Sequence, residues 1–71
     1  MDTRGLIATA YGIARSKGMN QSAWSSEAGY ALNGQTVSRI LKKGDCRLST
    51  FVNLLNVIDC ELVVIPREDM P

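Results

Sequence analysis

Apolar residues recur at helical spacing in four short segments of this chain, and most of these segments are bounded by a glycine or a helix-capping residue. In residues 4–17 the apolar positions fall three, four and seven residues apart, which is typical of an amphipathic helix. They are Leu6, Ala10, Ile13 and Ala14. Gly18 follows as a stop signal. Short helices in this number predict a mainly α-helical domain with one small core.

The second and third helices lie close together in the sequence. Asn20 is a good N-cap for a helix from Gln21 to about Ala28, whose inward side would carry Trp24. The Asn33-Gly34 turn precedes a third helix over residues 35–43. Its buried positions would be Val37, Ile40 and Leu41. Its opposite face carries polar and basic side chains and no carboxylate: Gln35, Thr36, Ser38, Arg39, Lys42 and Lys43.

The last part of the chain changes its period. Ser49 is expected to cap a fourth helix that runs through Asp59, with apolar positions at Val52, Leu54, Leu55, Val57 and Ile58. A β-branched run follows and Pro66 stops it: Glu61, Leu62, Val63, Val64 and Ile65. A lone strand leaves backbone groups unpaired and is prone to aggregation. We therefore expect residues 61–65 to pair with the same strand of a second copy, followed by a tail over 66–71.

The composition excludes several kinds of site. The chain has no His and two Cys, which removes His-based acid–base catalysis, the usual triads and most zinc sites. No metal-ligand cluster, phosphate loop or nucleophile–base pair is recognisable, so we expect no enzyme, no cofactor and no metal. No apolar run approaches the ~20 residues that span a bilayer, and no signal segment is evident. A cytoplasmic location in a bacterium or phage host is expected, with reduced cysteines.

Charge is unevenly distributed along the chain. Residues 1–47 carry seven basic and three acidic side chains, a net charge of +4, whereas residues 48–71 carry one basic and four acidic, a net charge of −3. Random segregation could produce this split, but it also indicates two surfaces with different partners. A domain of ~60 residues buries only about 60% of its unfolded surface, so oligomerisation is expected as well.

Two short helices joined by a tight turn, the second with a polar and basic face, form the helix-turn-helix pattern. The stretches KGMNQSAWSSEAG, TVSRILKKG and LSTFVNLLNVIDCEL resemble the Cro/C1-type (XRE) helix-turn-helix family of phage and bacterial repressors, over about residues 6–62. The tail ELVVIP resembles the HipB-type antitoxin branch, in which a terminal strand pairs across a dimer. The resemblance implies one lambda-repressor-like domain over 1–71, with four to five helices within about 4–59.

Two departures from the family pattern are visible. Gly29 and Val37 are eight positions apart, where six is usual, so either the turn is two residues longer or the second helix extends through Leu32. Ser25 stands where the family favours Ala, and it is still small enough for close packing. Outside the motif, Arg4 and the other two cations of the first helix, Arg15 and Lys17, are expected to keep that helix soluble.

The third helix of such a domain enters the DNA major groove. Base reading is expected from Gln35, Thr36, Ser38 and Arg39, because Gln suits adenine, Arg suits guanine and a Thr methyl suits thymine. Phosphate contacts are expected from Asn20, Gln21, Asn33, Lys42, Lys43 and Arg47. The sequence thus predicts a homodimeric, sequence-specific repressor on a palindromic operator. The alternative is a protein-interaction module, such as an antitoxin that neutralises a toxin protein without binding DNA.

Overall fold

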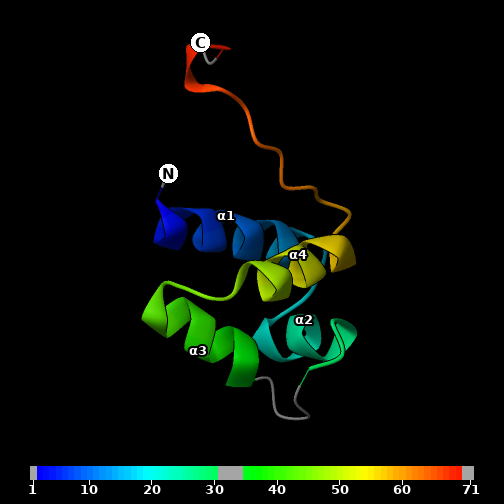
Figure 1. Cartoon of the computed structure of the whole chain (residues 1–71). Helices are drawn as coiled ribbons and strands as arrows, with labels where there is room; N and C mark the ends of the chain where they lie inside the picture. The colour runs from blue at the N-terminus through cyan, green and yellow to red at the C-terminus, as the bar shows by residue number, and fades with distance from the viewer. Residues whose placement is uncertain (1, 31–34, 70–71) are drawn as a thin grey trace.

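The computed structural model describes residues 2–30 and 35–69, and these ranges contain four α-helices and one 3-10 turn (Figure 1). The helices are α1 (Thr3–Ser16), α2 (Gln21–Glu27), α3 (Gln35–Lys43) and α4 (Leu48–Val57), and the 3-10 turn η1 is Arg67–Asp69. The mainly helical architecture predicted from apolar spacing is therefore confirmed. No helix in the described ranges combines the length and the apolar character needed to cross a bilayer.

α1 and α2 both end in a glycine that reverses the chain. After α1, Gly18 adopts a φ of +85°, and the Met19 N–H donates to the Ala14 carbonyl at 3.0 Å. After α2, Gly29 adopts a φ of +83°, and the next N–H donates in the same way to the Ser25 carbonyl. Both closures satisfy carbonyls that the helix leaves free, and glycine reaches this conformation without strain.

Trp24 lies at the centre of the core, with 1% of its surface exposed. Its ring stacks on Tyr11 of α1, with the ring centroids 6.0 Å apart. Its indole N–H donates to the Leu54 carbonyl of α4 at 3.0 Å. That carbonyl belongs to the last turn of α4, where intrahelical donors run out. Trp24 thus joins α2 to α1 by stacking and to α4 by a buried hydrogen bond, and the prediction that it belongs to the core is confirmed.

α4 begins earlier than expected. Arg47 is the N-cap residue, and its carbonyl accepts the Phe51 N–H at 3.0 Å, so Ser49 lies inside the first turn. The prediction that Ser49 caps this helix is therefore wrong. Val52, expected in the core, is 39% exposed, because α4 turns Phe51, Leu54 and Leu55 inward instead. The helix ends at Val57 rather than at residue 59.

The expected strand over residues 61–65 is not a strand in the described part of this single chain. These residues form an extended segment that leaves the body of the molecule beside α1 and α4 (Figure 1). A strand is defined by hydrogen bonds to a neighbouring strand. The described residues of one copy offer no such neighbour, so the segment leaves its apolar side chains exposed: Val63 by 61%, Val64 by 92% and Ile65 by 52%.

Candidate nucleic-acid interface

A buried hydrogen bond fixes the N-terminal end of α3 to α2. The Ser25 side chain is fully buried, and its hydroxyl oxygen accepts the Val37 N–H at 3.1 Å. Val37 lies in the first turn of α3, where backbone N–H groups have no partner within the helix. A serine here supplies an acceptor that alanine would not. The family pattern accounts for a small residue at this position but does not predict this bond.

Arg4 of α1 fixes the opposite end of α3. Its Nη2 donates to the Lys43 carbonyl at 3.1 Å, and its Nη1 lies 3.4 and 3.5 Å from the carbonyls of Leu41 and Lys42. A cation at a helix C-terminus also complements the helix dipole. Arg4 was expected only to keep α1 soluble, and that expectation is wrong: it caps the helix that carries the basic face.

Gly44 makes this cap possible. Its backbone is buried with a φ of +74°, and a Cβ built on it would lie 2.6 Å from Cζ of Arg4. Any side chain at this position would therefore displace the guanidinium group. The Lys43-Gly44 pair in the sequence indicates the end of a helix, but nothing in it indicates that an arginine some 40 positions earlier closes over that end.

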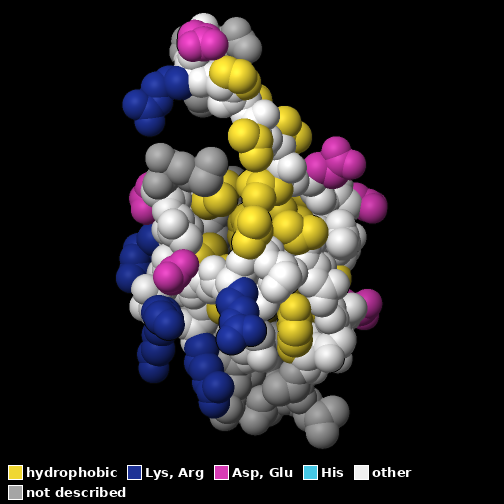
Figure 2. All heavy atoms as spheres, viewed as in Figure 1, with side chains coloured by type: hydrophobic (Ala, Val, Ile, Leu, Met, Phe, Trp, Pro, Cys, Tyr) yellow, Lys and Arg dark blue, Asp and Glu magenta, His cyan; other side chains and the backbone are white. Residues whose placement is uncertain are grey.

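Between its two anchored ends, α3 turns a polar face outward. Arg39, Lys42 and Lys43 are exposed, and Thr36 and Ser38 are half-buried. Figure 2 shows lysine and arginine side chains gathered over this part of the molecule, away from the hydrophobic patch near the tail. Because none of the described side chains on this face is acidic, the surface of α3 suits an anionic ligand.

A hollow of about 330 Å³ lies between α3 and the start of α4. Three cationic side chains line it, from Arg39, Lys43 and Arg47, against one carboxylate, Asp45. Thr36 lines it as well. The structure therefore brings together residues that the sequence analysis placed in two groups, one for base reading and one for phosphate contact. The hollow has excess positive charge and an open mouth, which fits a phosphate-bearing partner better than an apolar one.

The other predicted site residues are more dispersed. The Asn20 side chain accepts the Ala23 N–H at 2.8 Å, so its predicted role as N-cap of α2 is confirmed. Gln21 is half-buried at the first position of α2. Gln35 begins α3, but its side chain lies outside the described part of the structure, as does the whole of Asn33. For these four residues, contact with DNA stays a prediction.

The two cysteines, Cys46 and Cys60, are half-buried and unbridged. Burial, and then the negative charge of Asp45, raise the pKa of the Cys46 thiol. Within residues 2–30 and 35–69, no three His, Cys, Asp or Glu side chains lie close enough together to hold a metal ion. No family model, curated protein or solved structure matches this chain at a significant level. A functional assignment therefore depends on the geometry of its own residues.

Proposed function

We propose that this chain is a sequence-specific DNA-binding domain of the helix-turn-helix type, that α3 is its recognition helix, and that it acts as a repressor. The observation that carries the proposal is the exposed face of α3, which bears three cations and no carboxylate among its described side chains and is anchored at both ends. The major groove of B-DNA, about 12 Å wide, admits one α-helix. Anchoring matters because base readout requires a fixed helix orientation.

Each side chain on this face has a chemical role in the proposal. Arg39 would donate two hydrogen bonds to the O6/N7 edge of guanine, and the methyl group of Thr36 would contact thymine. Ser38 is short enough to let the helix approach the bases, and Gln35 suits adenine. Basic and polar side chains would contact the phosphates on either side: Asn20, Gln21, Asn33, Lys42, Lys43 and Arg47.

The proposed active form is a homodimer in which residues 61–65 of two copies pair as strands. Pairing would satisfy the free backbone groups of the extended tail and cover its apolar side chains. Two-fold symmetry would then place two α3 helices in successive major grooves. The operator is expected to be palindromic, with half-site centres about 10–10.5 base pairs apart or a multiple of that. Occupying such a site within a promoter would block transcription without any chemistry on the DNA.

The test begins with selection of bound fragments from random duplexes, followed by titration of the selected duplex over a range of salt concentrations. The logarithm of the affinity should fall with the logarithm of salt by about 0.9 per phosphate neutralised. The Lys42→Ala/Lys43→Ala double variant should reduce this slope by about 2 and weaken all duplexes alike. Arg15→Ala, which removes a cation from α1, is the control and should leave the slope unchanged.

Arg39→Ala tests base reading separately from charge. It should lower the affinity for the selected duplex by about 1–3 kcal/mol and relax the preference at one base pair. Unchanged operator binding would remove Arg39 from the base-reading set. If no duplex is bound at any salt concentration, while a protein partner is bound in a salt-insensitive way, the chain is an interaction module and the proposal is wrong.

A further inference from the structure

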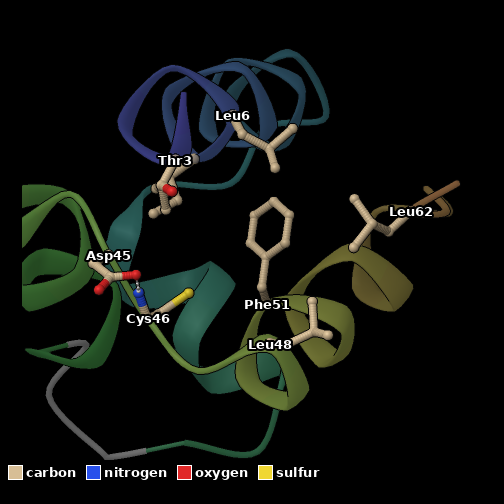
Figure 3. Close-up of a pocket in the computed structure, with 8 residues that line it drawn as sticks. Thr3, Leu6, Asp45, Cys46, Leu48, Phe51 and Leu62 are labelled. Atoms are coloured by element: carbon tan, nitrogen blue, oxygen red, sulfur yellow. Dashed lines mark hydrogen bonds between the residues drawn. The ribbon is translucent and has the colours of Figure 1, made fainter. Parts of the chain in front are cut away.

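An apolar groove runs between α1 and α4, on the side of the molecule from which the tail leaves. It consists of two adjoining hollows of about 210 and 160 Å³ that share Leu6, Phe51 and Leu62. Figure 3 shows these three side chains around one space, with Leu48 on its edge. We name this feature the α1–α4 groove. In Figure 2 the hydrophobic surface continues from the body onto the tail.

The chain itself demonstrates which chemistry fits this groove. Leu62, the second residue of the tail, is half-buried and lines both hollows. A branched aliphatic side chain from the tail is thus accommodated between α1 and α4, yet space remains on both sides of it. The next three tail residues, 63–65, are also branched aliphatics, and none of them is buried.

One copy of the chain cannot cover this tail with its described residues. In an extended segment, successive side chains point to opposite faces. Val63 and Ile65 therefore share one face, and Val64 lies on the other, and all three are more than half exposed. On α4, Leu48 is 65% exposed and Val52 is 39% exposed. These five residues are the large hydrophobic side chains that the described part of the molecule leaves in solvent.

We propose that residues 63–65 of a second copy pack into the α1–α4 groove, and that the first copy's tail does the same in return. The proposal rests on the homodimer of the proposed function and specifies the surface that receives each tail. Every copy carries both the apolar segment and the apolar groove, so one two-fold contact covers both at once. An unrelated partner that filled the groove would leave the tail exposed.

The dimensions allow this exchange. Residues 61–69, if extended, reach about 30 Å. α1, with 14 residues, is about 21 Å long. A partner's tail is therefore long enough to follow the groove from one end to the other. Because Leu62 stays in its own groove, the remaining tail residues are the ones free to cross to the other copy.

Light scattering coupled to size exclusion tests the contact without DNA. The full-length chain should have twice its monomer mass of 7.7 kDa at micromolar concentration. Val64→Asp in the tail and Val52→Asp at the groove should each raise the dimer dissociation constant at least tenfold. Ala8→Asp places the same charge on an exposed position of α1 that does not line the groove, and it should stay dimeric. A dimeric Val64→Asp variant, or a monomeric parent chain, would overturn the proposal.

Cross-linking distinguishes docking into the groove from contact between the two tails alone. In a Cys46→Ala/Cys60→Ala background, a Leu48→Cys variant is mixed with a Val64→Cys variant and oxidised. A disulfide between the two variants is the expected result. If Val64→Cys cross-links only to itself, the tails meet each other and not the groove, and the proposal is wrong. Circular dichroism confirms that each variant keeps its helices, since Val64 is 92% exposed in the single chain.

The outcome is separable from that of DNA binding. A monomeric Val64→Asp variant should still bind duplexes weakly in a salt-dependent way through α3, but lose the preference for two half-sites. Arg39→Ala should stay dimeric while losing base preference. A dimer that binds no DNA would contradict the proposed function and leave the tail contact supported.

Discussion

Arg4 and Gly44 together hold the C-terminal end of α3 against α1, and a double-mutant cycle measures how firmly. Arg4→Ala removes one hydrogen bond of ordinary length, 3.1 Å to the Lys43 carbonyl, and two long contacts of 3.4 and 3.5 Å. Because the donor is charged but exposed, we expect a loss of about 1–1.5 kcal/mol in the free energy of unfolding. A chain of this length has about 4–10 kcal/mol in total.

Gly44→Ala should cost more in the parent chain than in the Arg4→Ala variant. In both backgrounds alanine must adopt a φ of +74°, which costs about 1–2 kcal/mol. Only in the parent chain does the new Cβ also displace the guanidinium group, which lies 2.6 Å away, and so remove the contribution of Arg4. The two substitutions should therefore be less than additive by about 1 kcal/mol.

Urea denaturation followed by circular dichroism gives all four free energies. Lys17→Ala, which removes an exposed cation at the C-cap of α1, is the control and should change stability by less than about 0.5 kcal/mol. Additivity of Arg4→Ala and Gly44→Ala within about 0.3 kcal/mol would show that the guanidinium group does not lie over Gly44 in solution. The reasoning about the anchored end of α3 would then be refuted.

Three further predictions concern buried groups. Ser25→Ala leaves the Val37 N–H without its acceptor and should cost about 1–3 kcal/mol in urea denaturation, whereas a neutral substitution would mean that the hydroxyl group is not the acceptor. Trp24→Phe removes the indole donor to Leu54 as well as part of the ring, and should lower the unfolding free energy by about 2–3 kcal/mol; an unchanged melting temperature would contradict the assigned bond. Since its raised pKa keeps Cys46 a thiol when folded, its alkylation should rise only above the usual thiol pH range, and stability should fall as pH passes the unfolded thiol pKa; a titration that matches a free cysteine would refute this.

Apolar spacing predicts most of the helical architecture because burial of one stripe per helix dominates its stability. It fails at α4, where the expected apolar positions span more than one side of the helix and only one side can face the core. Val52 is therefore left at the surface. Ser49 fails as a cap for a related reason: a side-chain cap is worth about 1 kcal/mol, and the packing of Phe51 and Leu54 outweighs it.

The candidate site could be predicted from the sequence only in part. Helical periodicity suffices to place Arg39 and the two lysines after Leu41 on one outward face, because that relation is local. The contacts that anchor this face are not local: Ser25 meets Val37 twelve positions away, and Arg4 meets α3 across 37 to 39 positions. No spacing rule within a single sequence connects such residues.

Asp45 and Cys46 line both the α1–α4 groove and the cationic hollow beside α3. These two residues thus form a common wall, with an apolar chamber on one side and a charged one on the other. Anything that displaces this wall from one side alters the shape available on the other. By thermodynamic reciprocity, an occupant of the groove that changes the affinity of the hollow for its ligand by some factor must itself be bound more or less tightly by the same factor.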